Sequence, residues 1–478
     1  MKRYLPLACG LDIHRDTIEA CIAVSNAYEE PEMIRQSFTT LRGDLIKLRT
    51  WLAQHGCKNV AMESTGVFWR PVYEVLEEVE GINLCLVNAQ HMKNLPGRKT
   101  DVNDAQWIAE LFMCGLLEYS FVPDKRIRDL RECTRYYRKL KQERCRALNR
   151  MGKLLQTHGF KLSSVLSSID GVSAKRILER LCECGEVSVA DVRTALARGV
   201  KKSAEEIAFA VNGRLPETAR ALLRHMLYAL NTKDYELEYL NEIMESTRAP
   251  YNAQIELLST IPGVDTLAAT YIIAEIGVDM SRFSVTCDWK KPASRICAWA
   301  GLSPKNDTSA GIVKSRKIKK GNNYVKTILV QCAWAVTNCR NKRLSHWYWS
   351  HVGKLGEKTA IIAVARKLLV YIFHMLSNGC AYNNNLDCEA ADRIKAKKLE
   401  SAKKLLSKDV QNDASNEDPA TQNTKNTKSL KNHSVVESEV NLSDLPSGIK
   451  SPMSSPCETT TSHPHKKRGR PRKTTAIA

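Results

Sequence analysis

The sequence predicts an α/β domain first, then a long helical region, a mainly α-helical C-terminal domain and a basic tail. Three observations lead to this prediction. Short apolar strands alternate with amphipathic helices, two long helical stretches with a seven-residue apolar pattern follow, and the last stretch is rich in Asn, Ser, Thr and Lys with few aromatics. We therefore expect domains at 1–124, 125–250 and 251–380, and a disordered tail at 381–478.

The order of elements in the first domain predicts a mixed sheet with helices on its faces. The expected elements are two strands within 7–24 joined by a turn at 14–17, a strand at 36–39, a helix at 45–54, a strand at 59–62, a helix at 71–78, a strand at 83–87 and a helix within 97–112. Ligands of such sheets gather at the strand ends where connections diverge.

Four acids fall near those ends. Asp12 lies in the first strand, Glu63 ends the fourth, and Asp101 and Asp104 begin the last helix, three residues apart and so on one face. Four carboxylates at one point repel unless a cation joins them, and two Mg²⁺ (or Mn²⁺) ions about 4 Å apart fit this need. Separate roles also fit: helix-dipole acids for the pair, a solvated acid for Asp12 and a surface acid for Glu63.

Two long helices form the middle region, at 126–160 and 219–246, with a small helical insert at 167–216. Their apolar pattern suits an antiparallel coiled coil, a dimer seam or two helices of one bundle. The first helix is rich in Arg and Lys, which either contact phosphates or form a solvated face.

The C-terminal domain begins with 259–277, which resembles a helix–hairpin–helix, a motif that holds a backbone phosphate. Asp265 stands where such hairpins often carry glycine, and its charge favours a packing role instead. A polar loop, 304–311, then carries Ser309, which is either an ordinary loop serine or a nucleophile activated by a base or metal. After it come the cations expected to contact phosphates, Lys314, Arg316, Lys317, Lys319 and Lys320, and a helix begins near Tyr324.

Near its end the tail contains HKKRGRPRK, in which Arg468 and Arg470 flank Gly469. Such a segment matches an AT-hook, whose arginines enter narrow A·T minor grooves. A plain basic tail is the alternative interpretation.

The overall charge of +20 favours a polyanion as partner, with nucleic acid first and an anionic membrane surface second. No apolar run reaches the roughly 20 residues of a membrane-spanning helix, and we expect no secretion signal. The 16 cysteines include one CxC and no CxxC pair, which favours reduced thiols in a cytosol over disulfides or a zinc site.

Several motifs together resemble one family, the DEDD-type transposases of bacterial insertion sequences. GLDIH with Asp12, MESTG with Glu63, and GRKTDVNDA with Asp101 and Asp104 are similar to its acidic tetrad. IPGV…AEIG, AGLSP and SAG…KKGN resemble its C-terminal transposase domain, and the resemblance covers roughly 7–379. It implies a ribonuclease H-like (RuvC-like) first domain and a coiled coil between the two domains.

The resemblance also implies an activity and partners. The chain is expected to recombine its own mobile element, with Ser309 forming a covalent link to a DNA phosphate while the four acids hold Mg²⁺. A bridge RNA is expected to pair with donor and target DNA, and the site is expected to be composite, in a dimer or tetramer. The family commonly shows Ser-Ser-Gly-Gly at this loop, where this chain has Thr308-Ser309-Ala310-Gly311, so Thr308 is the less favoured nucleophile.

Two other functions stay open at this point. One is a metal-dependent nuclease or junction resolvase that cuts with water and never links to DNA. The other is a non-catalytic nucleic-acid-binding protein, for which the charge and the AT-hook are the functional parts. For the transposase and for both alternatives we expect a bacterial cytoplasmic protein that joins the nucleoid when bound to DNA, with no membrane partner.

Overall fold

The computed structural model describes residues 4–25, 30–64, 66–88, 104–283, 292–304, 307–309, 312–315, 317–339 and 342–383, and short stretches between 385 and 401. For 307–309 and 312–314 it describes the backbone alone. The chain divides into two compact units, which we describe separately. The first unit is Met1–Thr134 with Met244–Ala391, and the second is Arg135–Ile243 with the chain from Asp392 onward.

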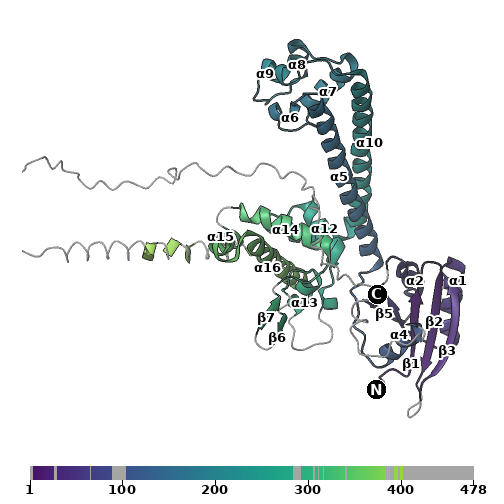
Figure 1. Cartoon of the computed structure of the whole chain (residues 1–478). Helices are drawn as coiled ribbons and strands as arrows, with labels where there is room; N and C mark the ends of the chain where they lie inside the picture. The colour runs from purple at the N-terminus through teal and green to yellow at the C-terminus, as the bar shows by residue number, and fades with distance from the viewer. Residues whose placement is uncertain are drawn as a thin grey trace, which may run out of the picture. The chain divides into compact units, whose positions relative to one another are not determined.

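The first unit begins with a five-stranded mixed sheet (Figure 1). Its strands are β1 (Leu7–Ile13), β2 (Thr17–Val24), β3 (Glu32–Thr39), β4 (Asn59–Glu63) and β5 (Asn83–Val87), in the order β3-β2-β1-β4-β5. β1 pairs antiparallel with β2 and parallel with β4, so the predicted mixed sheet is confirmed. β3 begins four residues before the predicted strand at 36–39, because β2 pairs with it along its whole length.

Helices cover both faces of this sheet. α1 (Arg42–Gln54) and α2 (Trp69–Leu76) pack on the face that carries Cys9, Leu11 and Ile13. α4 (Asp104–Met113) packs on the other face, against Ala8 and Ala61. Since side chains alternate along a strand, this arrangement assigns each residue of β1 to one of the two helical layers.

The rest of the first unit is mainly helical, as predicted. Its helices are α11 (Asn252–Ser259), α12 (Thr266–Ile276), α13 (Pro292–Trp299), α14 (Asn323–Thr337), α15 (Arg343–Leu355) and α16 (Glu357–Asn378). The loop predicted at 304–311 is partly wrong, because β6 (Asp307–Ser309) pairs antiparallel with β7 (Ile312–Ser315). β-branched residues such as Thr308, Ile312 and Val313 favour strand pairing, and the prediction gave more weight to the polar residues around them.

α16 is the one described helix that is long and apolar enough to cross a membrane by length and composition. The expectation from the sequence did not anticipate it. Half of its most apolar window is buried inside the protein, and Ala365, Leu368 and Ile372 belong to the core of the helical domain. A core helix passes the same test of length and composition.

The second unit is built on two long helices, α5 (Lys125–Thr157) and α10 (Glu217–Arg248), whose first and last turns respectively belong to the first unit. Four short helices connect them, α6 (Leu162–Val165), α7 (Val172–Cys184), α8 (Val189–Ala195) and α9 (Ala204–Ala210). These close over one apolar core that includes Met151, Leu178 and Leu223 (Figure 1). The expected helical insert is therefore a small folded cap on the pair of long helices.

Candidate active site

Three of the four predicted acids lie on one face of the sheet. The parallel register pairs Leu11 of β1 with Met62 of β4, so the next residues, Asp12 and Glu63, follow at the same edge. Asp12 alternates with Gly10, and Glu63 alternates with Ala61, on the face that α4 covers.

Close packing at Gly10 brings the third acid to this face. A Cβ at Gly10 would lie 2.0 Å from the carbonyl oxygen of Ala105 and 2.5 Å from the amide nitrogen of Ala109. The first turn of α4 therefore rests directly on β1, and only glycine leaves room for it. Asp104, the first residue of α4, is exposed next to Ala105. Asp101 lies outside the described residues.

The neighbouring acids act on the pKa of Asp12. Burial raises the pKa of Asp12; His14, whose Nε2 lies 3.2 Å from Asp12 Oδ2, opposes this shift, and the carboxylates of Asp104, Glu63 and Glu19 reinforce it. Like charges that raise a pKa in this way are the arrangement that a bound cation relieves. The sheet edge therefore carries a concentrated negative charge.

The donor chemistry fits Mg²⁺ or Mn²⁺, which prefer carboxylate oxygens. Within the described part of the chain, however, no three His, Cys, Asp or Glu side chains lie together closely enough to hold a metal ion. The described acids thus supply suitable ligands on a shared face without forming a closed cage by themselves.

Glu19 is an acid that the sequence prediction missed. It pairs directly with Asp12 across β1 and β2, and Ser37 Oγ donates a hydrogen bond of 2.5 Å to its Oε2. The signal was available, because a hairpin turn at 14–17 sets Ile13 opposite Ile18 and hence Asp12 opposite Glu19.

The predicted nucleophile, Ser309, ends β6, and its backbone pairs with Ile312 in β7. Its side chain lies outside the description, as does that of Lys314. Of the other cations predicted to follow it, Lys317, Lys319 and Lys320 are exposed, while Arg316 is outside the described residues. Arg468 and Arg470 of the tail are also outside them. The structure thus places the serine on a small hairpin, apart in sequence and in secondary structure from the acids.

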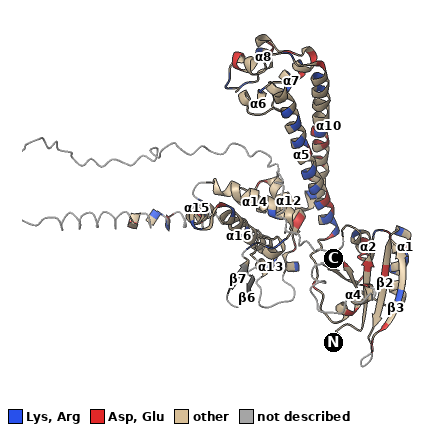
Figure 2. Ribbon diagram, viewed as in Figure 1, with Lys and Arg blue, Asp and Glu red and all other residues tan. Residues whose placement is uncertain are grey.

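The basic helix predicted at 126–160 carries its exposed cations as a stripe. Lys139, Arg146, Arg150 and Lys153 are exposed and fall within about 60° of one another around α5, over about 21 Å of its length. Figure 2 shows the cations along this helix in blue. Among the described residues none of the four forms an ion pair, and the same stretch has no exposed acid. We call these four residues the α5 stripe.

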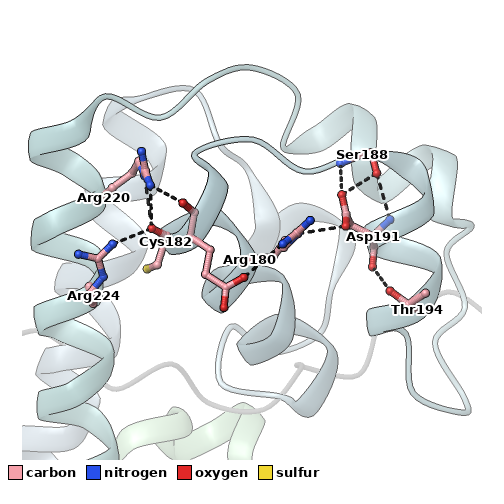
Figure 3. Close-up of polar contacts among 8 residues, drawn as sticks. Arg180, Cys182, Ser188, Asp191, Thr194, Arg220 and Arg224 are labelled. Carbon is pink, nitrogen blue, oxygen red and sulfur yellow. Dashed lines mark hydrogen bonds and ion pairs between the residues drawn. The ribbon is translucent and has the colours of Figure 1, made fainter.

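Several cations at the small folded cap formed by α6 to α9, unlike those of the α5 stripe, have polar partners within the described part of the protein (Figure 3). Arg224 donates to the Cys182 carbonyl at 2.9 Å, and Arg220 donates to the same carbonyl at 3.2 Å, which caps the C-terminal end of α7. Arg180 pairs with Asp191 at 3.1 Å, while Asp191 itself completes a capping box with Ser188. These cations have structural partners among the described residues, unlike the four cations of the α5 stripe.

Asp265 caps the N-terminus of α12, where its Oδ1 accepts a 2.7 Å hydrogen bond from the amide of Ala268. A carboxylate in that place occupies the amides that would otherwise bind a phosphate. The packing interpretation of 259–277 is thus the one that the geometry favours.

Comparison with known families agrees with this arrangement. A transposase family model of the DEDD IS110 type matches residues 9–159, and a second, described as transposase IS116/IS110/IS902 family, matches residues 255–348. No curated protein matches the chain. Both matches describe transposases, enzymes that cleave and rejoin DNA, and DNA is therefore the substrate. The chain belongs to the IS110 family of these enzymes.

Proposed function

We propose that this transposase cuts and rejoins DNA with Ser309 as nucleophile and with Asp12, Glu63, Asp101 and Asp104 as the ligands of divalent metal. The observation that supports it most is the placement of the described acids: Asp12 and Glu63 lie on the face of the sheet that α4 covers, Asp104 begins α4, and Asp104 and Glu63 both reinforce the raised pKa of Asp12. Carboxylates gathered on one face in this way suit a bound divalent cation.

In this mechanism the Ser309 hydroxyl attacks a DNA phosphorus. The new Oγ–P bond forms as one P–O bond of the strand breaks, the serine proton is released, and the departing DNA end takes up a proton as a hydroxyl. A second DNA hydroxyl later attacks the phosphoserine and restores the serine. The phosphoserine keeps the bond energy needed for rejoining, which hydrolysis by water would lose.

Mg²⁺ or Mn²⁺, held by the acids, would polarise the phosphate and stabilise its developing charge. The acids themselves bind and orient that ion, and α4 keeps Asp104 over β1 through its packing at Gly10. Glu19, which faces Asp12 across the hairpin, adds negative charge beside the ligands.

The finer features follow the family resemblance. We propose a ribonuclease H-like fold for the sheet domain, a coiled coil for α5 and α10, and domains with the boundaries expected from the sequence. A non-coding guide RNA would pair with donor and target DNA, and the site would be composite, in a dimer or tetramer. Cytoplasmic location is part of the same proposal, as are phosphate contacts by the cations that follow Ser309 and by Arg468 and Arg470 of the tail.

The test of the nucleophile is a covalent adduct. Full-length protein, Mg²⁺ and labelled element-end DNA should give an adduct that survives denaturation, and Ser309→Ala should abolish it while DNA binding persists. Thr308→Ala is the matched control and should keep the adduct. An adduct that persists in Ser309→Ala would disprove the serine assignment, and cleavage without any adduct would favour the hydrolytic nuclease.

The α5 stripe gives a separate test of nucleic-acid binding. Replacing its four cations with Gln should flatten the salt dependence of DNA or RNA affinity, by a slope of about 0.7 to 0.9 for each phosphate that the protein no longer neutralises. Replacing paired cations of the cap, such as Arg180 and Arg193, is the control and should leave the slope unchanged. Equal slopes for the stripe variant and the unchanged protein would mean that the stripe is only a solvated face.

A further inference from the structure

A buried carboxylate far from the acid cluster in sequence, Glu275, lies in the last turn of α12 and is 3% exposed. Asn322 Nδ2 donates to its Oε2 at 2.6 Å, and Arg131 Nε lies 3.6 Å from the same oxygen. Arg131 also donates to the carbonyls of Ala274 and Glu275, at 3.0 and 2.6 Å, and so caps the end of α12. The mechanism proposed above uses none of these groups.

The orientation of the Asn322 amide is fixed by its other contacts. Its Oδ1 accepts from the amides of Tyr324 at 2.9 Å and Val325 at 3.2 Å, which starts α14. Because two N–H donors require the oxygen on that side, Nδ2 is the group that faces Glu275. One side chain thus joins the start of α14 to the end of α12.

Asn322 also belongs to the base from which the Ser309 hairpin projects. This hairpin base consists of 299–304 and 318–322, on either side of β6 and β7. Its backbone contacts are Asn322 N to Trp299 O at 3.1 Å, Lys319 N to Ser303 O at 3.2 Å, and a bridge between Pro304 and Ile318. The two segments of the base pack so closely that a Cβ at Gly321 would lie 2.3 Å from the Gly301 amide nitrogen.

We propose that Glu275, held between Arg131 and Asn322, is a positioning residue that fixes the hairpin base and thereby aims Ser309. The proposal rests on Ser309 being the nucleophile. A nucleophile on a short hairpin acts only when its support is rigid, since an error of about 1 Å in its placement costs about 100-fold in rate. The three side chains tie the base to α12 and α5, which are long enough to be firm supports.

Asn322→Ser isolates this link. Serine also caps a helix N-terminus, so α14 keeps its cap, but its short side chain cannot reach Glu275. We expect amide exchange at Lys319 to rise about tenfold or more, because its bond to the Ser303 carbonyl opens more often. At saturating DNA, adduct formation should slow by about 10- to 100-fold, while DNA affinity stays within about twofold.

Two further variants control for reduced stability. Ser345→Ala removes one buried hydrogen bond, to the Thr337 carbonyl at 2.8 Å, in the same helical domain without touching the base. It should change neither exchange at Lys319 nor the adduct rate. Glu275→Gln keeps an acceptor for Asn322, and Arg131 keeps its two carbonyls, so this variant should stay closer to the unchanged protein than Asn322→Ser does.

Two results would overturn the proposal. Unchanged exchange at Lys319 in Asn322→Ser would show that the side-chain link to Glu275 does not hold the base. Faster exchange with an unchanged adduct rate would show that the base does not aim the serine. If the unchanged protein forms no adduct at all, the serine assignment fails, and the exchange data separate that failure from failure of the link.

Discussion

Two groups of acids, one in each unit, have opposite surroundings. In the second unit, Arg144 of α5 pairs with Asp170 at 2.9 Å and with Asp234 of α10, and Lys175 also reaches Asp234, at 3.1 Å. Burial alone would raise the pKa of Asp234, but the hydrogen bonds from Arg144 and Lys175 lower it. At the sheet edge of the first unit, burial and neighbouring acids raise the pKa of Asp12 instead.

This difference separates acids that pair with cations from an acid whose pKa is raised by burial and neighbouring acids. The carboxylates around Arg144 share its charge, so removing the cation leaves two partly buried acids with fewer charged partners. The acids around Asp12 repel one another, so removing one of them relieves the fold while it removes a candidate metal ligand. The same residue type thus predicts opposite outcomes in the two units.

The largest effect is expected for Asp12→Asn. Metal-dependent DNA cleavage should fall by more than about 100-fold, since even groups that only support a metal ligand contribute about 10- to 100-fold. The first unit should be no less stable than before, because a like charge is gone. All eight tryptophans lie in 1–134 or 244–391, so fluorescence follows the unfolding of the first unit.

Added Mg²⁺ completes this test. In the unchanged protein, Mg²⁺ at one hundred times its dissociation constant should raise the free energy of unfolding by about 2.7 kcal/mol, and the fluorescence midpoint should rise accordingly. In Asp12→Asn the rise should be smaller. Asp16→Asn is the control, since Asp16 is 70% exposed and pairs with Arg15 at 3.0 Å. An Asp12 variant that still cleaves at the normal rate would remove Asp12 from the site.

Arg144→Met should have the next largest effect, on stability alone. We expect the second unit to become less stable by about 2 to 3 kcal/mol, because the charged hydrogen bonds of Arg144 disappear and two acids are left in a partly buried place. Circular dichroism should show an earlier helical transition, while the tryptophan transition of the first unit stays in place. In Arg193→Met, whose pair with Glu205 is exposed on both sides, the free energy of unfolding should change much less.

The sequence predicted the part of this picture that depends on local pattern. Alternation and turn residues located all five strands of the sheet, and the parallel arrangement of β1 and β4 explains why acids at their ends share an edge. It did not predict what depends on contact between distant segments. The clearance at Gly10 and the link between Asn322 and Glu275 arise only once helices are packed, whereas the partner Glu19 could have been found from the hairpin register. The charges of α5 were visible, but which of them are neutralised was not.

The smallest expected effect is on the pH dependence of stability in Asp12→Asn and Asp234→Asn, and it amounts to about 1 kcal/mol or less. The pKa of Asp12 is raised in the folded protein, so its protonated form favours folding. This contribution to the free energy of unfolding is complete below the unfolded pKa, near 3.9, and is lost as the pH rises through the folded pKa. Asp234 has a lowered pKa and behaves in reverse, stabilising above about 3.9 and losing that contribution as pH falls through its folded value. In chelator, lowering the pH from 7 toward 4.5 should therefore shrink the stability difference between Asp12→Asn and the unchanged protein. The difference in unfolding free energy between Asp234→Asn and the unchanged protein should stay constant over that range. If the difference for Asp12→Asn also stays constant, the neighbouring acids do not repel Asp12.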